Sequence, residues 1–309
     1  MSLRVNPVLG RELHERMRSS RPFWVVGVFL GLLTLAVYLV FQSLSGFDEF
    51  DITRQTRTGR ALFETVILVM TLLIIFFVPG ITAASLAGER ERQTLQPMQI
   101  TLLRPRQLLA GKILASMSFL VLLIISALPV LVVCYLLGGI RIVDGVIGIA
   151  IVSLLALLLT TIIASLSARA KRVQGATLMA YGVTLFVLLI GPLLFVVANV
   201  ADDSSGGDPT QVPAFLVTLN PVAIVADAVG SDSGQTADAP LSGLRRSMVQ
   251  EWQSSGGSWF AWFPDDDVQV DRGDPFPAWL IGALVLAALA ALAAVRGVRA
   301  LRTPAEVER

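Results

Sequence analysis

The residues of this chain best able to do chemistry form one charged segment, Gly-Glu-Arg-Glu-Arg-Gln-Thr-Leu at positions 88–95. It lies between two long apolar runs, and charges are costly inside hydrocarbon, so we expect a water-side connector. Charged caps at the end of a membrane span are the plainer interpretation, but acids gain nothing from the preference for Lys and Arg on the cytoplasmic side. Alternating acids and arginines instead favour docking against a protein surface of complementary charge.

The expected docking region continues into the residues that follow, where leucine and methionine side chains would add apolar contacts. Pro97 should end the helix that carries the charges, because proline disfavours helix in the residue before it. A short second helix is expected over residues 98–103. The residues expected to contact a partner are Glu89, Arg90, Glu91, Arg92, Thr94, Leu95, Met98, Leu102 and Arg104.

The rest of the chain offers no site for catalysis. The only Gly-Lys pair, Gly111-Lys112, is followed by Ile113 instead of Ser or Thr and lacks the earlier glycine of a phosphate-binding loop. A single cysteine, Cys134, and a single histidine, His14, cannot build a metal site or an intramolecular disulfide. We therefore expect no catalytic, metal-binding or cofactor-binding residue in this chain, and no nucleic-acid partner.

Glu64 is the one acid inside an apolar run, one turn from the expected start of that run at Ala61. A buried charge is expensive at the middle of a bilayer and much cheaper near its interface. We interpret Glu64 as an interfacial acid paired with Arg60, and a role in proton-coupled transport is the alternative. Gly27 and Gly31, in the first apolar run, permit close helix approach; we expect contact with lipid or packing within the chain there, rather than a dimer seam.

The composition is that of a membrane protein. Of the 309 residues, 54% are hydrophobic and 15% are charged, whereas soluble domains are about 45–50% apolar and about 25% charged. The excess gathers in runs of about 20 residues, the length that crosses a ~30 Å hydrocarbon core. We predict an all-α polytopic membrane protein with six transmembrane helices, at residues 23–41, 61–84, 114–137, 145–166, 176–198 and 277–295.

The distribution of positive charge predicts the orientation of these spans. Most of the 24 Lys and Arg lie before the first span, after the second and fourth, and after the last. The positive-inside rule places these segments, and therefore both termini, in the cytoplasm. Lys112 and Lys171 are the only lysines in a chain rich in Ala and Gly, which suggests a GC-rich bacterial gene and hence a bacterial cytoplasmic membrane.

We expect residues 1–309 to form a single transmembrane domain, with spans over 23–198 and 277–309 including the last span and a cytoplasmic tail. Residues 1–22 read as an amphipathic helix on the inner membrane surface, although a soluble cytoplasmic helix is the alternative; its polar face carries Arg11, Glu12, Glu15 and Arg16. Residues 199–276 would be extracellular. Within them we expect a re-entrant or surface-lying hairpin at 214–230 and a short amphipathic helix at 241–253.

Two stretches carry a resemblance to a known family. Glu-Arg-Glu-Arg-Gln-Thr-Leu at 89–95, followed by Arg-Pro-Arg-Gln-Leu-Leu-Ala-Gly-Lys at 104–112, resembles the signature of type-2, export-class ABC-transporter permeases. That signature typically reads E-R-E-x-G-T-L-E, with Gly-Lys opening the third span after a proline-containing turn. Asn-Pro-Val-Leu-Gly-Arg-Glu-Leu at 6–13 is similar to the family's N-terminal connector helix. This chain departs from the pattern at Gln93 and Gln96, where the family has Gly and Glu.

The resemblance implies the permease subunit of an ATP-driven exporter. Two permease subunits, identical or related, would form the pathway in the lipid bilayer. Two separate ATP-binding subunits would dock on the connector helix and on a cytoplasmic coupling helix between the second and third spans. ATP and Mg would belong to those partners, so this chain would hold no cofactor and would not be an enzyme. The loop 199–276 would act as a gate while the pair switches between inward-open and outward-open states.

Two other functions stay open at this point. The chain could be a membrane scaffold that binds partners through its outer loop, or a secondary transporter that uses Glu64. The spans are almost uniformly aliphatic, which favours a lipid-like or amphiphilic substrate over a sugar or an ion. Spans that only face lipid would have the same composition, so the identity of the substrate is not determined.

Overall fold

The computed structural model describes residues 21–44, 52–93, 105–205, 219–230, 239–254 and 278–301. These residues form helices and contain no strand. The helices are α2 (Arg21–Leu44), α3 (Ile52–Thr82), α4 (Ala84–Glu91), α6 (Pro105–Leu137), α7 (Ile142–Ser167), α8 (Val173–Ser205), α10 (Pro221–Val229), α11 (Pro240–Ser254) and α12 (Ala278–Ala300). The all-α architecture predicted from the sequence is therefore confirmed.

Six stretches of helix are long and apolar enough to cross a membrane, and each of the six predicted spans corresponds to one of them. Some helices run further than the predicted spans. The third begins at Pro105, where proline suits a first turn because its missing N–H would have no helical partner. The fifth continues to Ser205. The predicted connector helix lies before α2, outside the described residues.

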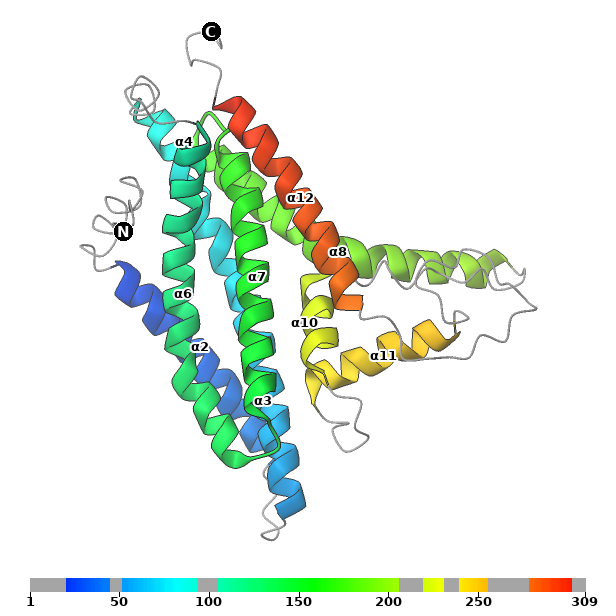
Figure 1. Cartoon of the computed structure of the whole chain (residues 1–309). Helices are drawn as coiled ribbons and strands as arrows, with labels where there is room; N and C mark the ends of the chain where they lie inside the picture. The colour runs from blue at the N-terminus through cyan, green and yellow to red at the C-terminus, as the bar shows by residue number, and fades with distance from the viewer. Residues whose placement is uncertain are drawn as a thin grey trace, which may run out of the picture.

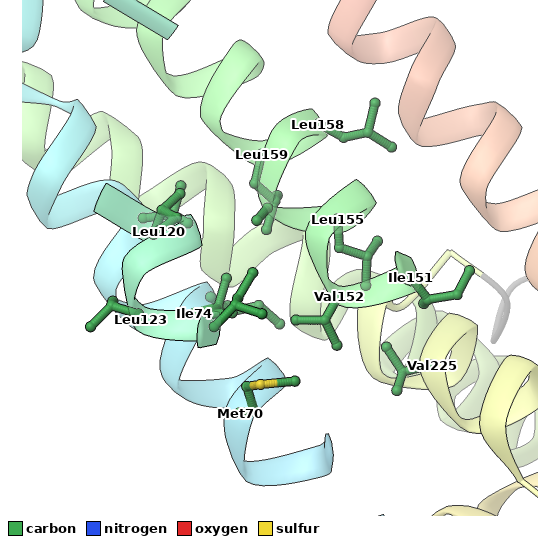
Figure 2. Close-up of a cluster of buried hydrophobic side chains, with 14 of the residues drawn as sticks. Met70, Ile74, Leu120, Leu123, Ile151, Val152, Leu155, Leu158, Leu159 and Val225 are labelled. Carbon is green, nitrogen blue, oxygen red and sulfur yellow. The ribbon is translucent and has the colours of Figure 1, made fainter. Parts of the chain in front are cut away.

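The second span, α3, is the centre of the bundle. It contacts α2, α6, α7 and α8, and 67% of its apolar window is buried, against 11% for α2. In Figure 1, α6 and α7 stand as neighbouring upright helices, with α3 packed against both. Figure 2 shows the aliphatic side chains that interlock between them, among them Met70, Ile74, Leu120, Leu123, Val152 and Leu155. Helices in a bilayer associate through close packing, so this layer sets their relative positions.

Glycines mark where helices approach most closely and where they do not. A Cβ on Gly148 would lie 2.9 Å from Cδ1 of Ile67, the flexible end of that side chain, so α7 and α3 approach closely at this point. By contrast, a Cβ on Gly27 or Gly31 would meet no atom within 4 Å. Of our two expectations for Gly27 and Gly31, contact with lipid or packing within the chain, packing is absent among the residues that the structure describes. The face of α2 that carries these glycines has no helix of this chain against it.

The apolar stretch expected as a hairpin at 214–230 is a helix in its described part, residues 219–230. This helix, α10, is capped by Asn220, whose Oδ1 accepts a hydrogen bond of 2.8 Å from the N–H of Val222, as N-cap residues do. It packs against α3, α7, α11 and α12 and is largely buried, so this part is not surface-lying. The predicted helix at 241–253 is α11. Figure 1 shows both beside the half of the bundle remote from α4.

A buried group of charges holds α10 and α11 in place. Nε of Arg60 lies 2.9 Å from Oε1 of Glu64, and its Nη1 lies 3.1 Å from Oδ2 of Asp144 on α7. Nη2 of Arg60 donates to the carbonyl of Val229 on α10. The backbone N–H and the hydroxyl of Ser242, on α11, donate to Glu64 over 2.8 and 2.5 Å. We call these five residues the Arg60 cluster; it joins four helices.

The predicted pairing of Glu64 with Arg60 is thus confirmed, but the predicted setting of Glu64 at a helix end is wrong. The helix begins at Ile52, nine residues before the expected start, so Glu64 lies more than three turns inside it. Its side chain is fully enclosed, with 0% exposure, because α10 and α11 cover it. Asp227 makes a second tie, accepting from Nε of Arg245 at 3.3 Å and from the N–H of Trp279 at 2.8 Å.

The helix that carries the docking charges ends earlier than predicted. The last residue of α4 is Glu91, whereas the sequence pointed to Pro97. The cause lies at Gln93, which adopts the left-handed conformation with φ of 58°. Its N–H bonds the carbonyl of Arg90 over 3.1 Å, which closes the turn. A side chain in this conformation costs about 1–2 kcal/mol, and it is the position at which the resembling permeases carry glycine.

Breaking the Arg60 cluster should destabilise the protein strongly. Arg60→Ala leaves Glu64 and Asp144 without the guanidinium between them, and loss of one partner from a buried ion pair costs about 3–5 kcal/mol. Titration with a denaturing detergent measures this free energy of unfolding. The matched control is Arg141→Ala, because Arg141 also pairs with Asp144 but is 83% exposed, where a pair contributes about 0–1 kcal/mol. Equal losses in the two variants would contradict the role assigned to the cluster.

Relieving the conformation at position 93 should stabilise the protein slightly. Gln93→Gly is expected to raise the free energy of unfolding by about 0.5–1 kcal/mol, since glycine adopts positive φ without a steric cost. Gln93→Ala is the control, because alanine keeps the Cβ that makes this conformation unfavourable. The same titration measures both variants. A glycine variant no more stable than the alanine variant would show that position 93 carries no strain.

Candidate functional site

The candidate functional site is α4 together with the helices that hold it. Its first tie is an ion pair in which Nζ of Lys112, on α6, lies 2.5 Å from Oε1 of Glu89, on α4. The side chain of Lys112 is 2% exposed. A lysine so deeply enclosed needs an anion beside it, because an unpaired buried charge is very unfavourable. The pair therefore fixes the distance between α4 and the start of the third span.

A second tie runs from α4 to the fifth span. Oε2 of Glu91 accepts a hydrogen bond of 2.9 Å from the backbone N–H of Val173. Val173 is the first residue of α8, and the first N–H groups of a helix have no partner within it and carry partial positive charge. The carboxylate of Glu91 thus caps the N-terminus of α8 and connects α4 to α8.

A third tie joins the end of α7 to the junction between α3 and α4. The chain leaves regular helix at Ala83. The hydroxyl of Ser167 donates to the carbonyl of Ala83 over 2.6 Å, and it accepts from the N–H groups of Leu86 and Ala87 over 3.2 and 3.0 Å. One hydroxyl therefore satisfies three backbone groups at this junction, and it holds the fourth span against α4.

Apolar packing completes the enclosure. A separate small core contains residues from α4, α6, α7, the turn after α7 and the end of α12: Leu86, Leu108, Leu109, Ala164, Ala168 and Leu301. Gly297 of α12 lies against α7, where an added Cβ would meet the Cα of Ser165 at 3.0 Å. The ends of four spans therefore converge on one eight-residue helix.

Only part of the predicted docking region lies within the described residues. Glu89 and Arg90 are partly buried, while Glu91 and Arg92 are exposed. Nη1 of Arg90 is buried and has no hydrogen-bond acceptor among the residues that the structure describes. The other predicted contacts are not described, namely Thr94, Leu95, Met98, Leu102 and Arg104, together with Arg11, Glu12, Glu15 and Arg16 of the connector helix.

Sequence reasoning missed the residues that anchor α4 from the other side. From the sequence, Lys112 was considered only as the lysine of an incomplete phosphate-binding motif. A lysine flanked by apolar residues is itself a signal, since it requires a buried anion nearby, and Glu89 is an acid at the end of the preceding span. Ser167 and Val173 gave no comparable signal, because their bonds involve backbone groups that every residue has.

This arrangement connects α4 to the membrane-spanning helices by specific bonds. Within the described ranges, no three His, Cys, Asp or Glu side chains gather as a metal site would require. The bonds instead connect α4 to α6, α7 and α8. A displacement of α4 therefore acts on three spans at once.

Comparison with known proteins now identifies the family. Residues 7–296, nearly the whole chain, match the family model described as ABC-2 family transporter protein. A search of curated proteins gave no match. The match confirms the resemblance seen in residues 89–112, and it agrees with six helices able to cross a membrane. This chain therefore belongs to the ABC-2 transporter family, as a multi-pass membrane permease component of an ABC transporter.

Proposed function

We propose that this chain is the permease subunit of an ATP-driven exporter, and that separate ATP-binding subunits dock against its α4 end. The observation that carries this proposal is the attachment of α4. A charged helix at the end of the bundle is bonded to α6, α7 and α8 through Lys112, Ser167 and Val173. Such attachment is what a helix needs if it receives force from a partner and passes it to the membrane spans.

The orientation follows from the distribution of charge. The segments around α4, between α7 and α8, and after α12 are rich in arginine, and arginine-rich segments stay on the cytoplasmic side. We therefore assign the α4 end and both termini to the cytoplasm. ATP-binding subunits are cytoplasmic in this arrangement, so they meet α4 from the side at which ATP is available.

Some residues of α4 face the proposed partner and others bond to the spans; Glu91 does both, because it is exposed and also accepts a hydrogen bond from the N–H of Val173. Arg92 and Glu91 are exposed, and with residues 94–104 they form the proposed contact with the ATP-binding subunit. Glu89 points inward to Lys112, so its proposed role is transmission to α6. Closure of the ATP-binding subunits would displace α4, and the permease would follow because nucleotide binding favours one of its two states.

The Arg60 cluster supports a gating role for α10 and α11 at the opposite end. Both helices are fastened to α3 and α7 by charged groups whose hydrogen bonds are buried. Movement of α3 or α7 therefore carries these helices along or requires the cluster to separate. Glu64 accepts bonds from Arg60 and Ser242, which is the arrangement of a structural ion pair and disfavours the alternative of a proton carrier.

A second permease subunit is proposed to pack against α2 and α8. Only 11% of the apolar window of α2 and 17% of that of α8 are buried within the chain, the lowest values of the six spans. Gly27 and Gly31 leave the α2 surface open for close approach of another helix. Between the two permeases the walls would be aliphatic, which suits a lipid-like or amphiphilic substrate.

Reversing an exposed charge of α4 should weaken docking without disturbing the permease. Arg92→Glu is expected to reduce ATP hydrolysis by the complex, and recovery of the ATP-binding subunit, by roughly ten times, because rim charges steer and orient protein contacts. The measurement is the ATPase activity of the purified complex and the ratio of the two protein bands after co-purification with an ATP-binding subunit from the same organism. Arg141→Glu, exposed at the opposite end, is the control.

Exchanging the charges of Glu89 and Lys112 tests whether their ion pair passes force from α4 to α6, independently of how the partner docks. Glu89→Lys alone should uncouple ATP hydrolysis from transport, whereas Glu89→Lys combined with Lys112→Glu should restore much of the coupling, because the buried pair is rebuilt with reversed polarity. Full docking by the Arg92→Glu variant, or the absence of any co-purifying ATP-binding subunit, would refute the proposal and favour a membrane scaffold.

Photo-crosslinking should capture a second permease at α2. In a Cys134→Ala background, Leu35→Cys carries a benzophenone maleimide on the open face of α2, where Leu35 is 52% exposed. Irradiated membranes should yield a product of about twice the mass of the chain, since a contacting helix lies within reach of the probe. Ile125→Cys on α6, 54% exposed, is the matched control and should give lipid adducts. Equal yields of dimer from both sites would contradict this interface.

A further inference from the structure

Four hydroxyl groups inside the bundle have no hydrogen-bond partner among the described residues. They belong to Thr82, Ser85, Ser116 and Thr160, which are exposed by 0%, 9%, 0% and 0%. Many other hydroxyls of the spans donate to a carbonyl one turn back, as Thr65, Thr71, Thr161 and Thr184 do. Burial without a partner is unfavourable for a hydroxyl, so these four groups require an explanation.

The first two lie at the same depth on facing helices. Ser85 precedes Glu89 by four residues on α4, and Ser116 follows Lys112 by four residues on α6. Because Glu89 and Lys112 are in contact and the two helices run in opposite directions, both serines lie about 6 Å further into the bundle, on the faces that carry the ion pair. They therefore lie one turn beneath it, on the two helix faces that the ion pair joins.

The two threonines continue this row inward. Thr82 lies three residues before Ser85 and thus on the same side of the α3–α4 segment. Thr160 lies two turns before Ser167 on the same face of α7, and Ser167 contacts Ala83. Since α3 and α7 run in the same direction, as the Arg60–Asp144 contact at their other ends shows, Thr160 lies about 10 Å deeper, at the level of Ile75 and Phe76.

Pro79 adds a backbone group to the same region. Proline has no N–H, so Pro79 cannot donate to the carbonyl of Ile75, one turn back in α3. Spanning helices tolerate proline where Ser and Thr side chains or ordered waters satisfy the carbonyl that it releases. Ser167 supplies such a partner at the Ala83 junction, but Thr82 and Thr160 have no protein partner of their own.

We propose that ordered water molecules bind between α3, α4, α6 and α7, hydrogen-bonded to these four hydroxyls and reaching from the Lys112–Glu89 pair to the level of Ile75. A buried water typically makes about three hydrogen bonds to otherwise unsatisfied polar groups, and this row supplies such groups about one to two turns apart. Next along α6 and α7 lie Leu120 and Leu159, which belong to the apolar cluster of Figure 2 and close the site.

The water has a mechanical consequence that rests on the proposed function. Separation of Lys112 from Glu89 inside an apolar bundle would leave two unpaired charges. Water held beside them offers each charge alternative hydrogen bonds while α4 moves against α6. The ion pair can then keep α4 bound to α6 in the resting state and separate during the transport cycle. The hydration itself does not depend on this role.

Cysteine labelling tests the site. In a Cys134→Ala background, Ser116→Cys and Thr160→Cys are treated in membrane vesicles with 2-aminoethyl methanethiosulfonate, and modification is followed by intact mass spectrometry. The controls are Ala127→Cys and Ala156→Cys, on the same two helices and also 0% exposed. The thiols at 116 and 160 should react roughly ten times faster than the controls, because a thiolate forms only where water reaches it. Equal rates would overturn the proposal.

Radiolytic footprinting examines the unaltered chain and decides the matter if a cysteine variant does not purify as the wild type does. Hydroxyl radicals generated from bound water should oxidise Leu120 and Leu159 although both are at most 1% exposed, and should spare Met70, which is 0% exposed in the apolar core. Oxidation that spares both leucines overturns the proposal. Neither measurement involves ATP or a partner, so failure of the hydration site and failure of the permease function are distinguishable.

Discussion

The structure depends on the pairing of the few charges that enter its apolar interior. Burial of an unpaired ion costs several kcal/mol, so each buried charge restricts where neighbouring helices can lie. Lys112 requires Glu89, and thereby brings α4 against α6. Arg60 requires Glu64 and Asp144, and thereby brings α3 against α7. Aliphatic side chains fill the space between these two ion pairs. They restrict the relative positions of the helices less than the ion pairs do, because aliphatic packing tolerates small shifts.

The two pairs lie near opposite ends of the same central segment, since Arg60 is near the start of α3 and Glu89 is near the end of α4. Between them the segment is buried against α6 and α7, loses one helical hydrogen bond at Pro79 and has a turn between α3 and α4 at Ala83. It is therefore held firmly at both ends and is weakest as a helix near α4. In the proposed function, such a segment would receive a displacement at α4 and carry it towards α10 and α11.

The sequence predicted the all-α fold, the six spans and the Arg60–Glu64 pair, because apolar run length and i, i+4 spacing are local properties. It did not predict that α10 is a buried helix, nor that Ser242 covers Glu64, since both depend on contacts between distant segments. It placed the end of α4 at Pro97 because Gln93 is not a residue that usually stops a helix; its positive φ emerges only in the structure. Glu89 was recognised as important, but its inward contact with Lys112 required knowledge of where α6 begins.

The central claim is that α4 receives force from an ATP-binding subunit and passes it to the spans. The most direct test is an electron cryomicroscopy structure of this chain in complex with the ATP-binding subunit that co-purifies with it, without nucleotide and with bound ATP. The account predicts that the ATP-binding subunit lies against Glu91 and Arg92, and that α4 shifts together with the starts of α6 and α8 when ATP binds. A subunit that docks at the α11 end, or an α4 that stays fixed against the spans in both states, would contradict it.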